Sequence, residues 1–154
     1  MTAAITDMDA LFDADMDAIE DLPPVGVPPT GCYNLLVSAE RAAGKESGNE
    51  FVKFSYEVTA INEVKNPEEA NQAAVGMKFT EFFSPFKKDG TPNEWGQKFM
   101  KQAIKPFAEH FGVRSFGEAL AQINKVEVMA VLVRVADKKD PDRISARLSD
   151  VTIL

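Results

Sequence analysis

The chain has 154 residues, of which 45% are hydrophobic, so it can form one domain with a core of ordinary size and an appendage. Its single cysteine and single histidine exclude an internal disulfide and a Cys/His zinc cluster within one chain, and they favour a reducing compartment. No run of about eighteen apolar residues occurs and the N-terminus is acidic, so the sequence predicts neither a membrane span nor a secretory signal. We therefore expect a cytoplasmic protein without membrane contact.

The net charge of −7 is concentrated at the N-terminus. Residues 1–21 contain seven acidic side chains and no Lys or Arg, and removing these seven from the chain's 24 acids leaves 17, which equals its number of Lys and Arg. The rest of the chain is therefore neutral on average, which is typical of a domain with an acidic tail. The seven acids are Asp7, Asp9, Asp13, Asp15, Asp17, Glu20 and Asp21.

Residues 1–22 are predicted to form a disordered acidic tail, because their few apolar side chains cannot bury enough surface to offset the ordering of the chain. A marginally stable amphipathic helix from about Met8 to Ile19 is the alternative. The Pro-rich stretch 23–30 is predicted to be an extended linker. The folded domain is then expected to cover residues 31–154.

The acidic repeat DMDA, at 7–10 and 15–18, raises the question of a calcium loop. Asp13, Asp15 and Asp17 match the first three ligand positions of an EF-hand. The sixth position requires Gly and is Ala18, and the twelfth requires a bidentate Glu and is Pro24. We therefore predict no metal site in this segment.

Three strands are predicted in the first half of the domain, at 31–40, 51–61 and 76–86. The second is the clearest, because apolar side chains at its even positions alternate with mostly polar ones at its odd positions. Such alternation predicts one buried and one exposed face.

A helical segment is predicted from Asn93 to Asn124. Pro106 should kink this helix or split it in two, and Gly112 is a plausible end. Ser115 to Glu118 matches a capping box before a second, shorter helix. Two more strands follow, at 125–135 and 143–154, the first apolar almost throughout.

Five short strands with a helical insertion between the third and the fourth favour a mainly β fold, the five-stranded OB-fold barrel. A generic α+β sheet domain with the same order is the alternative.

Several of these motifs also occur together in a known family. They are the entry PPTGCY at 28–33, the strand FVKFSYEV at 51–58, the Gly-led strand GMKFTEFF at 76–83 and the helical insertion. Over about residues 28–154 the chain resembles the single-stranded DNA-binding proteins of bacteriophages. The resemblance implies an OB-fold that coats single strands during phage replication, recombination or repair, in the host cytoplasm. Better-known members of the broader class carry their acidic tail at the C-terminus, whereas here the acids are N-terminal.

Binding of a single strand without sequence preference requires cations along the phosphates and aromatic faces for the bases. Residues 78–105 contain six lysines against three acids, and six aromatic residues. Strand parity then predicts which side chains point outward, namely Phe51 and Lys53, Lys78 and Phe82, and Arg147. The candidate nucleic-acid-binding residues are Phe51, Lys53, Lys78, Phe82, Phe86, Lys87, Lys88, Trp95 and Arg147.

Each candidate also has an ordinary structural explanation. Most phenylalanines should be core, Phe51 could cap one end of the sheet, and Trp95 lies beside the apolar side of its helix. The stripe formed by Lys98, Lys101 and Lys105 is typical of a solvated helix face.

An enzyme is not indicated. The sequence has no Gly-rich phosphate loop and no nucleophile elbow, and a pair of Cys32 with His110 has no supporting signature. We predict no catalytic residues, no metal and no cofactor.

The leading hypothesis is therefore a non-catalytic single-stranded DNA-binding protein. Its tail would compete with DNA and dock replication or recombination proteins, through Asp7, Asp9, Leu11, Phe12, Asp13, Asp15, Asp17 and Ile19. The alternative is a protein-interaction or inhibitor module whose acidic tail is the active part. The sequence leaves the oligomeric state open.

Overall fold

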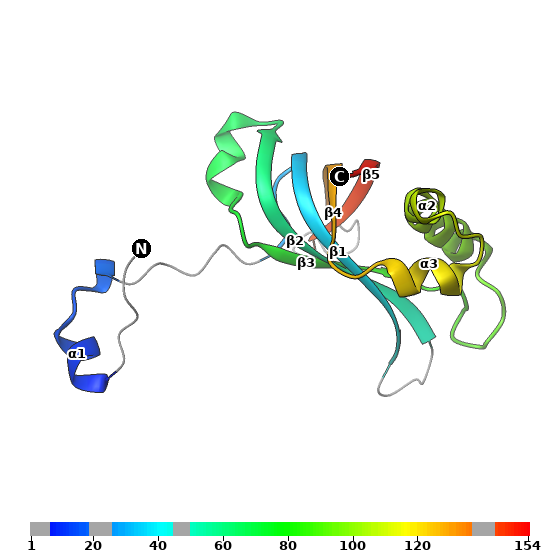
Figure 1. The fold of residues 1–154 in the computed structure, drawn as a ribbon, viewed down its shortest axis with the longest axis horizontal. Helices are drawn as coiled ribbons and strands as arrows, with labels where there is room; N and C mark the ends of the chain where they lie inside the picture. Colours follow the sequence, from blue (N-terminus) through cyan, green and yellow to red (C-terminus); the bar gives the residue numbers. More distant parts are fainter. Residues whose placement is uncertain (1–6, 19–25, 45–49, 137–143) are drawn as a thin grey trace.

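The computed structural model describes residues 7–18, 26–44, 50–136 and 144–154. They form a mainly β domain built on one five-stranded antiparallel sheet, with its strands in the order β3-β2-β1-β4-β5 (Figure 1). The predicted order of three strands, a helical segment and two strands is confirmed. The strands are β1 (Gly31–Ala43), β2 (Glu50–Val64), β3 (Lys78–Phe83), β4 (Val126–Ala136) and β5 (Ile144–Ile153). The helices are α1 (Met8–Asp13), α2 (Glu94–Phe111) and α3 (Phe116–Gln122), with short 3-10 helices η1 (Met16–Ala18) and η2 (Pro67–Gln72).

The core lies on the face of the sheet that the alternation of β2 predicts. Val52, Phe54, Tyr56 and Val58 are all buried, while the residues between them are half-exposed. On β1, Tyr33, Leu35 and Val37 are buried in the same way. Successive side chains of a strand point to opposite faces, so a local pattern is enough to choose the buried one.

Helices α2 and α3 lie against each other beside the sheet (Figure 1). Helix α2 buries Met100, Ile104 and Phe107, which lie on one side of it, and it is continuous past Pro106. Of the two predicted effects of Pro106, a kink or a split, the split is therefore wrong. The apolar stripe extends across the proline, and the burial of that stripe offsets the lost backbone hydrogen bond.

The ends of both helices follow the sequence signals. The Asn93 side chain accepts a 3.0 Å hydrogen bond from the Gly96 amide at the start of α2, and Gly112 ends the helix with a left-handed φ of +71°. The Ser115 hydroxyl accepts from the Glu118 amide at 3.1 Å and caps α3 as predicted.

The sheet is open. Strands β3 and β5 contact each other and both contact α2, but no hydrogen-bonded pairing joins them within the described ranges. Strand β3 has only six residues, and β5 is irregular near Asp150, whose φ is +50°. Because of these two features, β3 and β5 lack the hydrogen-bonded pairing that would close the sheet into a barrel.

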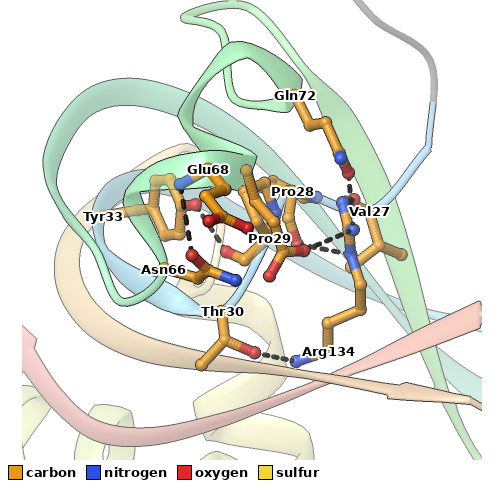
Figure 2. Close-up of polar contacts among 10 residues, drawn as sticks. Val27, Pro28, Pro29, Thr30, Tyr33, Asn66, Glu68, Gln72 and Arg134 are labelled. Atoms are coloured by element: carbon orange, nitrogen blue, oxygen red, sulfur yellow. Dashed lines mark hydrogen bonds and ion pairs between the residues drawn. The ribbon is translucent and has the colours of Figure 1, made fainter.

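The entry motif PPTGCY is packed into the domain by Arg134 of β4 (Figure 2). The Arg134 guanidinium donates hydrogen bonds to the carbonyl oxygens of Val27 at 2.6 Å and Pro28 at 3.2 Å, and to Gln72 of η2 at 2.8 Å. It also lies 3.4 Å from the Glu69 carboxylate. This arginine therefore joins the entry segment, η2 and β4.

Other contacts complete this cluster. The Tyr33 hydroxyl donates to the Pro29 carbonyl at 2.5 Å, and the Thr30 hydroxyl accepts from the Arg134 amide at 3.0 Å. Gly31 leaves no room for a side chain, because an added Cβ would collide with the carbonyl oxygen of Glu63. Pro28 and Pro29 are fully buried, so the end of the predicted linker from 27 to 30 is part of the folded domain.

Within the predicted tail, residues 7–18 form α1 and η1 and bury no side chain. The Asp7 carboxylate caps α1 by accepting a 2.7 Å hydrogen bond from the Ala10 amide. The helix is shorter than the alternative predicted from Met8 to Ile19, and Ile19 lies outside the described residues. Across the described parts of the chain, none of the helices combines the length and the apolar character that crossing a membrane requires.

Candidate nucleic-acid interface

Strands β2 and β3 bring three predicted residues together on their outer face. Lys53 pairs with Phe82 in the antiparallel register. The rings of Phe51 and Phe82 meet edge to face, with 5.5 Å between centroids. Phe82 is 57% exposed even though it has this neighbour. An aromatic pair beside a lysine, open to solvent, is the arrangement that stacks a base and holds its phosphate.

The loop after β3 places two more cations next to this pair. Phe86 forms a bridge with Pro92, and the Lys87 amide donates to the Thr91 carbonyl at 2.8 Å, so the loop is a small closed turn. A hollow of about 360 Å³ is bordered by Phe51, Phe86, Lys87 and Lys88, with Gly44, Glu50, Ser84 and Asn93. Phe86, Lys87 and Lys88 of this loop therefore border the same hollow as Phe51.

The first turn of α2 provides a second aromatic group. Trp95 is 70% exposed, its ring lies 6.2 Å from that of Phe99, and the Lys98 ammonium is 5.0 Å from its centroid. The Arg147 guanidinium of β5 lies 5.8 Å from the Phe99 ring. Trp95 is thus an exposed cation–π platform, and the alternative that it packs into the core is wrong.

A close backbone contact holds this turn against the end of β3. The Asn93 amide side chain donates to the Ser84 carbonyl at 3.0 Å, and the Gln97 side chain donates to the Pro85 carbonyl at 3.1 Å. At Gly96 an added Cβ would collide with the Ser84 carbonyl. Glycine is therefore needed for α2 to start at this position.

Lys78 lies apart from these groups. It is opposite Glu57 at the far end of the β2–β3 ladder, 3.8 Å from that carboxylate. The glutamate offsets its charge, and it borders neither of the two hollows that the structure describes. Lys105 of the helical stripe is likewise 3.9 Å from Glu109, in agreement with a solvated helix face.

A cleft of about 800 Å³ opens between β3, β5 and α2, where the sheet is not closed. Phe82, Phe99 and Arg147 line it together with the buried ends of Phe54 and Phe107. The cleft joins the two aromatic groups described above, because Phe82 belongs to the first and Phe99 touches Trp95. Of the predicted residues, Phe82 and Arg147 thus line this cleft, and Phe51, Phe86, Lys87 and Lys88 line the smaller hollow. Lys53 and Trp95 line neither, but they neighbour Phe82 and Phe99.

Glu81 is the residue of this cleft that the sequence analysis missed. It lies between Phe79 and Phe83 on β3, and its Oε1 accepts a 2.8 Å hydrogen bond from the Tyr56 hydroxyl. Burial raises the pKa of the Glu81 carboxyl, while the Tyr56 hydrogen bond and the charge of Arg147 lower it in part. Burial, together with Glu81, raises the pKa of Tyr56 well above its ordinary value. An acid at an inward position of an otherwise apolar strand face was the available sequence signal.

This surface carries charges of both signs, since Glu50, Glu81 and Asp150 line its two hollows. Lys53, Lys87, Lys88, Lys98 and Arg147 have no carboxylate within 4 Å in the part of the chain that the structure describes. The described residues also contain no group of three or more His, Cys, Asp and Glu side chains placed to hold a metal ion. The domain is neutral on average, and these five cations lie near the aromatic residues of β2, β3 and α2.

Comparison of the sequence with protein-family models and with curated proteins found no match.

Proposed function

We propose that this protein binds single-stranded DNA without a sequence requirement and without catalysis, in phage replication, recombination or repair. The observation that carries the proposal is an aromatic surface made of exposed Phe82, Phe86, Trp95 and Phe99 and half-buried Phe51. It is bordered by cations that have no carboxylate within 4 Å among the described residues. Solvent-exposed rings beside free cations suit stacked bases and tracked phosphates.

The proposed fold class is the OB-fold. The order β3-β2-β1-β4-β5 is that of a five-stranded barrel opened between β3 and β5. The aromatic pair Phe51–Phe82 lies on β2 and β3, the strands that carry ligands in this class. Topology and ligand face therefore agree.

A fluorescence titration tests DNA binding directly. Trp95 is the chain's one tryptophan and is 70% exposed, so oligo-dT should quench its emission on stacking. Affinity should fall with salt between about 50 and 200 mM, with roughly −0.7 in log–log slope for each phosphate neutralised. Absence of binding to oligo-dT at the lowest salt, also after removal of residues 1–22, would refute the proposal.

The acidic tail is proposed to compete with DNA for the same surface and, once displaced, to dock replication or recombination proteins. Helix α1 supports both roles, because Asp9 and Asp13 carry charge while Phe12 is 80% exposed. Deleting residues 1–22 should tighten oligo-dT binding, most at low salt where screening is weakest. Equal affinities of the full chain and the deletion variant would leave only the docking role.

The exposed Phe12 also supports a second candidate, a protein-interaction or inhibitor module whose tail is the active part. Exposed apolar side chains in an acidic segment suit a partner groove with basic edges. A tail peptide that captures a protein partner, together with a domain that does not bind oligo-dT, would favour this candidate over the first.

A further inference from the structure

The cleft between β3, β5 and α2 carries chemistry that a purely sequence-independent groove does not need. Cations and aromatic rings are sufficient to bind any single strand. This cleft also contains Glu81, a carboxylate that repels phosphate, so its presence beside the proposed DNA surface calls for a role.

Glu81 is held in one position and has acceptor capacity left. The Tyr56 hydroxyl occupies one site on Oε1, whereas an ionised carboxylate offers about four sites on two oxygens. Arg147 lines the same cleft, yet no ion pair within 4 Å joins it to Glu81 among the described residues. The cleft therefore presents Glu81 from β3 as an acceptor and Arg147 from β5 as a donor, which make no ion pair with each other, and Asp150 of β5 also lines it.

The space and the apolar walls suit one base. The volume of about 800 Å³ falls in the range of roughly 300–1,000 Å³ typical of small-molecule sites. Phe99 from α2 contributes an exposed ring, and Phe82 borders the cleft from β3 with its ring on the outer side of the sheet beside Phe51. Proteins read unstacked bases by aromatic stacking combined with hydrogen bonds to the Watson–Crick edge.

We propose that this cleft takes one unstacked base of the bound strand and that Glu81 selects guanine. The inference rests on the proposed DNA binding. Guanine presents two adjacent donors, N1–H and N2–H, that match the two carboxylate oxygens, and acceptors O6 and N7 that suit an arginine.

The other bases do not match this pair of groups as well. Adenine and cytosine each present one amino donor beside a ring-nitrogen acceptor, and thymine presents one N–H between two carbonyls. In each case an acceptor of the base would face a carboxylate oxygen, which is repulsive. A bidentate contact discriminates by roughly 1–3 kcal/mol, which is about 5- to 150-fold, and we expect a preference of about tenfold, near the lower end of that range.

Competition with the full-length protein tests this proposal. A labelled dT oligomer is displaced by unlabelled dT oligomers of equal length that carry one central dG, dA, deoxyinosine or 7-deazadeoxyguanosine. We expect dG to compete about tenfold better than dA, which stacks as a purine but lacks the paired donors. Deoxyinosine, which lacks N2–H, should lose most of that advantage, and 7-deazadeoxyguanosine should lose part of it through Arg147.

The variant E81Q should bring the dG-to-dA ratio close to one, since a neutral amide cannot accept both donors while still accepting the Tyr56 hydrogen bond. E127Q makes the same charge change at an exposed position of β4 and should keep the wild-type ratio. Because deoxyinosine is tested on the wild-type protein, the proposal stays falsifiable even if E81Q folds poorly.

The outcomes separate the two proposals. If oligo-dT does not bind at all, the proposed function fails. If oligo-dT binds with the expected salt slope while dG and dA compete equally, only the guanine site fails. A dG preference that deoxyinosine shares, or that a folded E81Q retains, would also overturn the assignment to Glu81.

Discussion

Arg134 and Arg147 lie on neighbouring strands, where Arg134 pairs with Ala146, the residue next to Arg147. Arg134 points to the inner side and makes hydrogen bonds to Val27, Pro28 and Gln72. Arg147 has an exposed side chain over the Phe99 ring and makes no ion pair within the described chain. A cation whose donors are used by the fold stabilises the domain, whereas one whose donors are free can bind a ligand. The same distinction separates the Arg134 cluster from the aromatic surface.

The largest expected effect of a substitution is on stability, at Arg134. Arg134→Ala should lower the free energy of unfolding by about 3 kcal/mol, because it removes charge-assisted hydrogen bonds and leaves the partly buried carbonyl oxygens of Val27 and Pro28 without this donor. Urea denaturation measures the change. Arg41→Ala is the matched control, since Arg41 is exposed and, among the described residues, paired only with exposed Glu50, and it should cost less than about 1 kcal/mol. Similar losses in both variants would contradict the division into two kinds of arginine.

The next effect is on binding, at Phe82. Phe82→Ala should weaken oligo-dT binding by roughly tenfold, since one base–aromatic stack is worth about 1–3 kcal/mol, and should change stability little because the ring is 57% exposed. Anisotropy titration and urea denaturation measure the two quantities. Phe116→Ala on α3 removes a ring of 43% exposure that lines neither hollow, and its affinity should match the wild type. A Phe82→Ala variant that unfolds instead would mean that Phe82 is needed for the stability of the fold.

A smaller effect is expected in the salt dependence of binding. Lys87→Ala and Lys88→Ala should each reduce the magnitude of the log–log salt slope by about 0.7, because each removes one phosphate contact. Lys105→Ala is the control, because Lys105 is already 3.9 Å from Glu109 and should leave the slope unchanged. Equal changes for all three lysines would mean that DNA senses the total charge of the domain and not a particular surface.

The smallest effect is on the pH dependence of stability, through Glu81. Burial raises the pKa of its carboxyl in the folded state, so the folded protein binds this proton more tightly than the unfolded chain. The stabilisation that comes from this protonated carboxyl is complete below the ordinary glutamate pKa. It is lost as pH rises through the folded-state pKa. Gln is permanently neutral, so Glu81→Gln should raise Tm at pH 7 and the gain should shrink toward pH 4. A gain that is constant with pH would indicate packing and not ionisation.

Local patterns predicted much of the fold. The period-two alternation of β2 and β3 correctly placed Phe54, Tyr56 and Phe79 inside and Phe82 outside, because side-chain direction along a strand depends only on neighbouring residues. Helix ends at Gly112 and Ser115 were also predicted, since caps are local hydrogen-bonding features.

Contacts between distant segments could not be predicted in this way. The sequence contains no sign that Arg134 holds Val27, 107 positions away, or that Glu57 offsets the charge of Lys78. Sheet closure was also beyond local reasoning, because it depends on how far β3 and β5 extend toward each other. Phe82 was correctly expected to face outward, but the cleft that it borders appears only once β5 and α2 are in place.

The sequence by itself determined the concentration of acid in residues 1–21, the buried face of each main strand and the collection of aromatic and lysine residues in 78–105. Tertiary structure alone decided which of those lysines are ion-paired and which arginine makes hydrogen bonds within the fold. It also decided that Glu81 and Arg147 line the same cleft. The physical reason is that side-chain periodicity and composition are properties of neighbouring residues. Pairing of charges, by contrast, depends on strand register and on the way helices pack across the open side of the sheet.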